Sequence, residues 1–270
     1  MEQNNLELTL FTPFSREFSI FRYLEWLDRA KLDKKKTRLV FMDNSHNQFV
    51  RNALIGYLKK VNDQWGDTMY VNIDRDRVLE AGPKRWQVIA DNMNESLKFL
   101  QTPYYAMVED DTIPPDDAIS RLKAHLNDDV RMAQGTEIAR STDRFVGAWD
   151  LMTNEQGHII SMKSKELKHS GTEEITGGGF FCFVCDSKIF EQIKFTGDGR
   201  NSFAGPDTLF PFDITKLGYK AIIDWSVKCD HIQPLLNGDI EIIKADKARI
   251  QIKEIISERK LKVSFNDQSL

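Results

Sequence analysis

Three consecutive acidic residues, Glu109, Asp110 and Asp111, directly follow the apolar run Tyr104–Val108. An uninterrupted apolar run predicts a strand that is covered on both faces, as at the centre of a parallel sheet. In open α/β sheets, ligands bind beyond the carboxyl ends of the strands. The three carboxylates therefore lie where a ligand site is expected.

Neighbouring carboxylates raise one another's pKa unless a positive charge lies among them. A divalent cation would supply that charge, because Mg²⁺ and Mn²⁺ prefer oxygen ligands and bind one or two carboxylates together with substrate phosphates. Side chains alternate along an extended backbone, so Glu109 and Asp111 should face one side while Asp110 turns away. The spacing predicts a Mn²⁺ or Mg²⁺ site, and an acidic loop that stays in water is the alternative interpretation.

The elements that position these residues alternate between strands and helices in the first half of the chain. Strands are predicted at residues 6–11, 38–42, 69–73 and 104–108. Helices are predicted at residues 15–27, 50–61 and 83–100. Pro13 should end the first strand, Ser15 can cap the first helix, and Pro83 suits a first helical turn. This alternation is typical of a sheet joined by crossover helices.

The second half of the chain has a looser pattern. Strands are predicted at residues 132–139, 144–151, 180–185 and 220–227. Helices are predicted at residues 116–126, 187–193, 207–217 and 245–256. Residues 166–176 read as a polar loop, and residues 198–206, rich in glycine and polar side chains, are suited to a mobile lid.

The composition favours one α/β domain in the 270 residues, with 41% hydrophobic and 29% charged residues. A net charge of -4 argues against a protein that coats nucleic acid. Cys182, Cys185 and Cys229 make an odd count, which favours reduced thiols over a disulfide framework. The chain starts without a signal peptide pattern and has no spanning apolar run, so we expect a cytoplasmic protein without integral membrane association.

Several motifs in order resemble the family-2 glycosyltransferases and their GT-A relatives. They are Asp43 after the second strand, Arg85, E-D-D-x-x-x-P from Glu109, G-G-G-F, G-P-D-x-x-F and a late strand ending in a histidine. The resemblance covers about residues 6–231. It implies a GT-A fold, a Rossmann-like mixed sheet flanked by helices, in a single domain. It divides the chain into a nucleotide-sugar half at 1–115, an acceptor half at 116–235 and a helical tail at 236–270.

The resemblance also implies a donor site and a metal site. Thr12 and Pro13 would lie beside the nucleotide, Asp43 would accept from an N–H of uracil or another base, and Arg85 or Lys84 would meet the base or diphosphate. Glu109 and Asp111 match the two acidic positions of the D-x-D motif, with glutamate at the first. The implied donor-binding residues are Thr12, Pro13, Asp43, Arg85, Glu109 and Asp110. The implied ligands of Mn²⁺ or Mg²⁺ are Asp111 and His231.

The acceptor side is implied by the G-P-D and G-G-G motifs. Asp207 matches the general base of inverting members, although Pro206 stands where the family has a glutamate. Gly178 and Gly179 would allow close approach of the donor sugar and acceptor. Trp149, or Trp225, would stack on a sugar or base, unless it belongs to the core.

The implied function is the transfer of a sugar from a nucleotide-sugar, expected to be UDP-linked, to an acceptor hydroxyl with inversion. If Asp207 only caps a helix, the enzyme is retaining or its base lies elsewhere. A nucleotidyltransferase would need a glycine-rich loop that residues 11–16 lack, and a non-catalytic nucleotide-sugar-binding module is a candidate of another class. The acceptor stays open between a saccharide, a lipid-linked intermediate, a protein and modified DNA bases, the last as in phage-type enzymes that act in a host cytoplasm.

Overall fold

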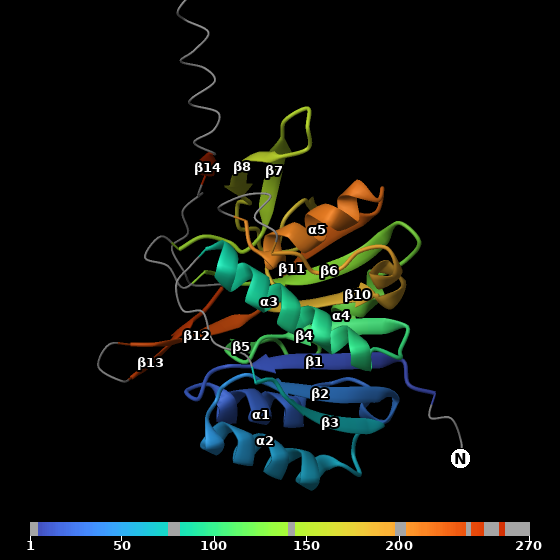
Figure 1. Cartoon of the computed structure of the whole chain (residues 1–270), viewed down its shortest axis with the longest axis vertical. Coiled ribbons are helices and arrows are strands. Elements are labelled where there is room, and N and C mark those ends of the chain that lie inside the picture. Colours follow the sequence, from blue (N-terminus) through green and yellow to red (C-terminus); the bar gives the residue numbers. More distant parts are fainter. Residues whose placement is uncertain are drawn as a thin grey trace, which may run out of the picture.

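The centre of the molecule is an eight-stranded mixed sheet (Figure 1). The computed structural model describes residues 5–74, 82–139, 144–197, 204–235 and 239–245, and the backbone of residues 254–256. The strand order is β3 (Asp67–Asn72), β2 (Thr37–Asp43), β1 (Leu8–Phe14), β4 (Tyr104–Val108), β10 (Cys182–Asp186), β6 (Val130–Thr136), β11 (Lys220–Lys228) and β9 (Thr172–Ile175).

The first four strands of this order run parallel, so their carboxyl ends meet at one edge of the sheet. β10 runs antiparallel between β4 and β6, which makes the sheet mixed. The described α-helices are α1 (Ile20–Arg29), α2 (Gln48–Val61), α3 (Pro83–Ser96), α4 (Ala118–Ala124) and α5 (Pro206–Lys216). The predicted alternation of strands and helices in the first half is confirmed.

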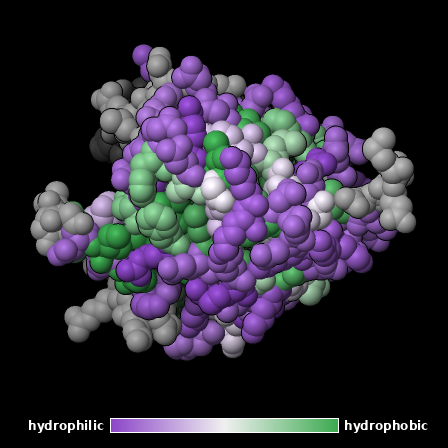
Figure 2. All heavy atoms as spheres, turned by 90° about the horizontal axis from the view of Figure 1, so that it is seen from below, coloured by the Kyte–Doolittle hydropathy of each residue, from purple (hydrophilic) through white to green (hydrophobic). Residues whose placement is uncertain are grey.

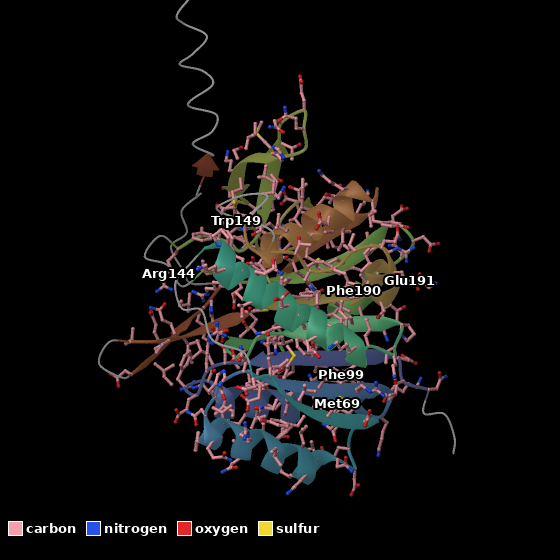
Figure 3. All side chains as sticks on the ribbon, in the orientation of Figure 1. Met69, Phe99, Arg144, Trp149, Phe190 and Glu191 are labelled. Atoms are coloured by element: carbon pink, nitrogen blue, oxygen red, sulfur yellow. The ribbon has the colours of Figure 1, made fainter. Side chains whose placement is uncertain are left out.

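Side chains of the central strands alternate between two cores on opposite faces of the sheet. On β1, Leu10 joins the core that packs against α1, α2 and α4, whereas Phe11 joins the core under α3 and α5. In the second core Phe190, which is labelled in Figure 3, stacks on Phe210 of α5, with ring centroids 5.4 Å apart. Helices therefore cover both faces, which explains why β4 is uninterrupted in its apolar character.

Two small sheets extend the edges of this core. One contains β5 (Thr112–Ile113), β12 (Asp230–Pro234) and β13 (Ile240–Ile243), and the other contains β7 (Trp149–Thr153), β8 (Ile159–Ser164) and β14 (Glu254–Ile256). β5 begins directly after the three acidic residues, and His231 of β12 pairs with Thr112. This pairing brings a late part of the chain to the carboxyl end of β4.

The first strand and first helix differ from prediction. β1 continues through Pro13, which pairs with Met42, because the pairing of β1 with β4 already ends at Phe11 and leaves Pro13 with a partner strand on one side only. The helix begins at Ile20, so Ser15 does not cap it.

Three further predictions were wrong. Residues 166–176 contain β9, and the 3-10 helix Ser187–Glu191 replaces the predicted α-helix at 187–193. The tail is not helical where it is described, since Ile240–Ile243 and Glu254–Ile256 are strands. These segments are rich in β-branched isoleucine, which packs well on a pleated surface. Of the predicted lid, residues 198–203 lie outside the described residues.

The face seen from below is mostly hydrophilic, with hydrophobic residues gathered towards one side (Figure 2). Phe21 of α1 and Phe49 of α2 are exposed and pack edge to face, with ring centroids 5.7 Å apart. Among the described helices, none has both the length and the apolar character that a membrane crossing requires.

Candidate active site

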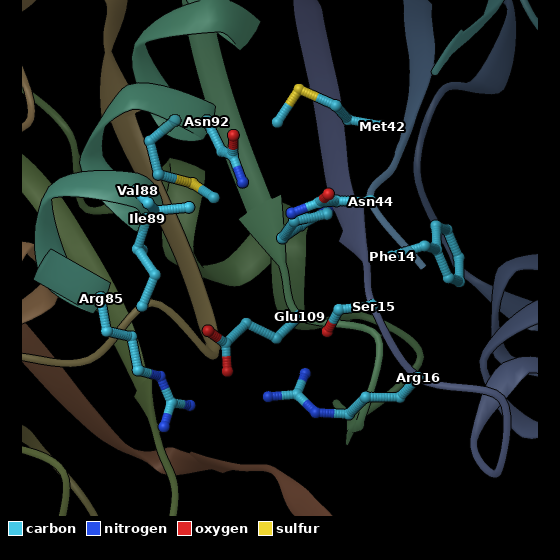
Figure 4. Close-up of a pocket in the computed structure, with 12 residues that line it drawn as sticks. Phe14, Ser15, Arg16, Met42, Asn44, Arg85, Val88, Ile89, Asn92 and Glu109 are labelled. Carbon is cyan, nitrogen blue, oxygen red and sulfur yellow. The ribbon is translucent and has the colours of Figure 1, made fainter. Parts of the chain in front are cut away.

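A cavity of about 150 Å³ opens where β1 and β2 end, beside α3 (Figure 4). Its apolar lining includes Pro13, Phe14, Met42, Val88, Ile89 and Met93. Its polar lining includes Ser15, Arg16, Asn44, Arg85, Asn92 and Glu109. An apolar slot with a few converging polar groups is the usual form of a small-molecule site. Three of the predicted donor-binding residues, Pro13, Arg85 and Glu109, lie in its wall.

Asp110 ties the loop after β1 to the end of β4. Its Oδ2 atom accepts hydrogen bonds from the backbone N–H groups of Ser15 at 2.7 Å and Arg16 at 2.8 Å, and Oδ1 forms an ion pair with the Arg16 guanidinium. Burial raises the pKa of Asp110, an effect that Arg16 opposes. Both carboxylate oxygens of Asp110 bind Ser15 or Arg16 of the loop after β1. Asp110 therefore holds this loop in position and is not part of the cavity wall.

Asp111 and His231 lie side by side in the interior. The Oδ2 atom of Asp111 is 3.3 Å from Nε2 of His231, and both residues are buried. The β5–β12 pairing produces this contact, because the backbone N–H of Ile232 donates to the carbonyl oxygen of Asp111 at 2.8 Å. The two residues that the resemblance assigned to the metal are thus brought together although 120 positions separate them.

Glu137, directly after β6, is a further carboxylate beside this pair. Its Oε1 atom accepts a hydrogen bond from Oγ1 of Thr112 at 2.7 Å and lies 3.4 Å from Nδ1 of His231. That nitrogen is also 3.0 Å from the carbonyl oxygen of Ile138. A carbonyl oxygen only accepts, so Nδ1 must carry the hydrogen. In the neutral ring, the lone pair of Nε2 is then directed towards Asp111.

The Asp111–His231 pair has the chemistry of a divalent cation site. Mn²⁺ accepts both carboxylate oxygen and imidazole nitrogen, and hydrogen bonding of the other ring nitrogen is usual for a metal-binding histidine. Across the described part of the chain, no three His, Cys, Asp or Glu side chains are arranged to hold a metal ion. Asp111 and His231 fit a site with two protein ligands, in which phosphate oxygens and water would supply the rest.

Glu109 projects into the cavity between the guanidinium groups of Arg16 and Arg85 (Figure 4). Burial and the Asp111 carboxylate raise the pKa of Glu109 to about 8, although Arg16 works in the opposite direction. Arg85 is exposed on the first turn of α3, and the neighbouring Lys84 is not among the residues of the cavity wall. Glu109, like Glu137, thus lies near the Asp111–His231 pair, but on the side of the cavity.

Asp43 and Thr12 have other partners than the predicted nucleotide. Asp43 accepts hydrogen bonds from the Ser45 backbone N–H at 2.8 Å, the Ser45 hydroxyl at 2.6 Å and the Tyr70 hydroxyl at 2.7 Å. Thr12 is fully buried and hydrogen-bonds the hydroxyl of Tyr23. Asn44, the residue directly after Asp43, is the polar residue that lines the cavity at the end of β2.

Asp207 lies in the first turn of α5. Burial raises the pKa of its carboxyl group, while its own backbone N–H and that of Thr208 donate hydrogen bonds to it. A side chain at Gly205 would meet both Oδ1 of Asp207 and the indole of Trp86, the residue after Arg85. The start of α5 therefore packs against the first turn of α3, near the mouth of the cavity.

The predicted acceptor-side residues pack against the protein itself. A Cβ atom at Gly178 would clash with Gln134, and one at Gly179 would clash with the ring of Phe181. Trp149 is only 6% exposed and packs on Phe145, with ring centroids 5.1 Å apart. Trp225 is fully buried, and its indole donates to Glu173 at 3.2 Å. Tight internal packing accounts for these glycines without a ligand, and Trp225 belongs to the core.

Sequence reasoning missed Asn92 of α3, which lines the cavity, and three residues that follow strand ends, namely Arg16, Asn44 and Glu137. The strands are β1, β2 and β6, whose carboxyl ends face the cavity or the acidic cluster. This position could have identified Asn44 and Glu137, since polar residues at strand ends are where α/β sheets bind ligands. The role of Arg16 depends on contacts with Asp110, 94 positions away, and with the neighbouring Asp111.

No family model matches the chain, and no curated protein matches it in sequence. Solved structures do match. GalNAc-T7 with UDP, GalNAc and Mn²⁺ has a TM-score of 0.62 and 13% identity, over 87% of this chain. The mannosyltransferase PcManGT from Pyrobaculum calidifontis, in complex with GDP-Man and Mn²⁺, has a TM-score of 0.53 and 13% identity, over 82%. TarS of S. aureus has a TM-score of 0.51 and 12% identity, over 81%.

The chain has the GT-A fold. This confirms the predicted fold class of a mixed α/β sheet flanked by helices. The chain spans 45% of the GalNAc-T7 structure, 57% of PcManGT and 35% of TarS. In the GT-A fold of this chain, the cavity and the Asp111–His231 pair lie together at the carboxyl edge of the parallel strands.

Proposed function

We propose that this chain is a metal-dependent glycosyltransferase that moves a sugar from a nucleotide-sugar to an acceptor hydroxyl. The donor that we propose first is a UDP-sugar. The observation that carries the proposal is the buried Asp111–His231 pair, 3.3 Å apart, next to a cavity with an apolar slot and two arginines. The GT-A structures crystallised with UDP or GDP-Man and Mn²⁺ support the same conclusion.

The roles of the residues follow from their positions. The apolar slot between Met42 and α3 accepts the base, with Asn44 and Asn92 offering amide donors and acceptors to its edge. Arg85 faces the diphosphate. Asp111 and His231 would hold a Mn²⁺ or Mg²⁺ ion, which would supply positive charge to the departing diphosphate.

Asp207 is the proposed base for an inverting reaction. It takes the proton from the acceptor hydroxyl while that oxygen attacks the anomeric carbon from the face opposite the diphosphate. The start of α5, which packs against Trp86 beside Arg85, supports this position. The acceptor remains one of four classes: a saccharide, a lipid-linked intermediate, a protein or modified DNA.

The direct test is a hydrolysis screen of purified protein against UDP-, GDP- and other nucleotide-linked sugars. A metal-activated donor without an acceptor should react slowly with water, so we expect release of UDP from at least one UDP-sugar with Mn²⁺. Release should stop when EDTA removes the metal. No release from any donor, with Mn²⁺ or Mg²⁺, would contradict the proposed function.

A second prediction concerns Glu137, which we propose holds the His231 ring in orientation. Replacing Glu137 with glutamine keeps an oxygen for the Thr112 hydroxyl but removes the charge beside Nδ1. Groups that hold a metal-binding histidine in this way contribute about 10- to 100-fold in metal affinity. We expect the Kd for Mn²⁺, measured from the electron paramagnetic resonance signal of free Mn²⁺, to rise by that factor.

The control for this measurement is Glu155→Gln, because Glu155 is an exposed residue in the turn between β7 and β8. Its Kd for Mn²⁺ should equal that of the unchanged protein. If Glu137→Gln also leaves the Kd unchanged while both proteins melt at the same temperature, Glu137 has no part in metal binding.

A further inference from the structure

Arg16 lies between the cavity and the acidic cluster. Its guanidinium forms an ion pair with Asp110, its Nε atom is 3.3 Å from Oδ2 of Asp111, and its side chain is 21% exposed. The same side chain lines the cavity, together with Glu109 and Arg85. Arg16 is thus in contact with the proposed metal site and with the proposed donor site at once.

One carboxylate oxygen of Asp111 lies equally close to the guanidinium of Arg16 and to the imidazole ring of His231. Oδ2 of Asp111 is 3.3 Å from Nε of Arg16 and 3.3 Å from Nε2 of His231. A divalent cation bound between Asp111 and His231 would lie beside this oxygen, and therefore close to the Arg16 guanidinium. Two cations at such short range repel each other, so metal binding and the present position of Arg16 oppose each other.

The charge of Arg16 is permanent. Burial disfavours the charged form, but the carboxylates of Asp110, Asp111 and Glu109 more than offset this and raise the pKa of Arg16 above its ordinary value. A guanidinium displaced from Asp111 keeps its charge and its ion pair with Asp110, and its other N–H groups can donate to a further anion. Arginine binds phosphate oxygens well because its planar fork donates two parallel hydrogen bonds.

The cavity provides the place for that anion. Arg16 from the loop after β1 and Arg85 from α3 approach Glu109 from opposite sides at the cavity mouth (Figure 4). Two arginines from separate elements that face one another across a mouth can hold the two phosphates of a diphosphate. Without a donor, Glu109 occupies the position between them.

We propose that Arg16 is a diphosphate-binding residue that serves as the counter-ion of Asp111 in the donor-free protein and moves to the phosphates when a divalent cation takes its place. This rests on the proposed function, since it assumes a nucleoside diphosphate and a metal at this site. The metal and the nucleotide then bind cooperatively, because each favours the position of Arg16 that the other requires.

The test is Arg16→Gln, with two binding measurements that need no turnover. The Kd for Mn²⁺ alone should fall about fivefold, because the competing charge beside Asp111 is gone. The Kd for UDP at saturating Mn²⁺, measured by titration calorimetry, should rise about 10- to 100-fold, the range of a charge-assisted hydrogen bond. The proposal requires that the Kd for Mn²⁺ falls while the Kd for UDP rises.

Two variants make the result interpretable. Arg22→Gln removes a charge from an exposed position of α1 and should leave both Kd values unchanged. Arg16→Lys keeps the positive charge near Asp111 but not the planar fork, so it should bind Mn²⁺ like the unchanged protein and UDP more weakly. The Ser15 and Arg16 backbone N–H groups can still donate to Asp110 in either variant at position 16, and melting temperatures check that the loop is retained.

The possible outcomes separate the two proposals. If the unchanged protein binds neither Mn²⁺ nor UDP, the proposed function is wrong. If it binds both and Arg16→Gln changes neither Kd, or weakens both alike, Arg16 is only a part of the loop and this inference is overturned while the proposed function stands.

Discussion

Replacing Asp111 with asparagine should remove Mn²⁺ binding and, with it, metal-dependent release of UDP. Asparagine has the same shape and can still accept a hydrogen bond near His231, but it lacks the negative charge that a divalent cation requires. Partners that only support a metal ligand are worth about 10- to 100-fold in affinity. The loss of a ligand should therefore raise the Kd for Mn²⁺ by at least about 100-fold, and kcat/KM at fixed Mn²⁺ should fall by a similar factor.

The measurement is a Mn²⁺ titration followed by electron paramagnetic resonance, repeated as a donor hydrolysis assay over a range of Mn²⁺ concentrations. Asp128→Asn is the control, because the Asp128 side chain is fully exposed and its change should alter neither quantity. Asp111 is not a metal ligand if its variant binds Mn²⁺ as tightly as the control. Recovery of activity at high Mn²⁺ concentration would support a role in affinity, as expected for a ligand.

The fold was predictable wherever the signal lay within one element. The apolar run of β4 is buried from Tyr105 to Val108, and Pro83 does begin α3. Predictions failed where pairing with a distant strand determines the secondary structure. β14 is a strand because it pairs with β8, about 90 positions earlier, and no local pattern near Ile255 records that partner. The end of β1 was misplaced because a proline is tolerated where only one neighbouring strand remains.

The candidate site was predictable where side-chain alternation along one strand decides which way a residue faces. Side-chain alternation after β4 separates Asp110 from Glu109 and Asp111, and the structure keeps this separation: Asp110 holds the loop after β1 while Glu109 faces the cavity. What Asp110 contacts could not be predicted, because its partner Arg16 is 94 positions away.

A role assigned by resemblance assumes that the side chain is available to a ligand, and hydrogen bonds to neighbouring residues can already occupy it. Asp43 has the predicted position at the end of β2, yet the hydroxyl groups of Ser45 and Tyr70 and a backbone N–H occupy its oxygens. A motif records which residue stands at a strand end. It does not record which neighbours have already paired with that side chain, and here the cavity receives Asn44 instead.

Replacing Asp207 with asparagine should lower kcat about 100- to 10,000-fold, the usual contribution of a general base, with little change in the KM of the donor. The pH dependence gives a second readout. Burial raises the pKa of Asp207 above the ordinary value of 3.8, so the carboxylate needed as a base forms only at higher pH. The kcat of the unchanged enzyme should therefore fall on the acid side at a pH above that of an ordinary aspartate, and the variant should lack this limb.

A purely structural role for Asp207 predicts a different result. An acidic residue in the first turn of a helix stabilises it by about 0.3–1 kcal/mol through the helix dipole. Asp207→Asn would then lower the melting temperature slightly and leave kcat and its pH profile unchanged. Asp213→Asn removes a carboxylate near the other end of the same helix and should leave kcat and its pH profile unchanged. If kcat survives in the Asp207 variant, the base lies elsewhere or the enzyme is retaining, and the anomeric configuration of the product, read by NMR, decides between these two, because only a retaining enzyme keeps the configuration of the donor.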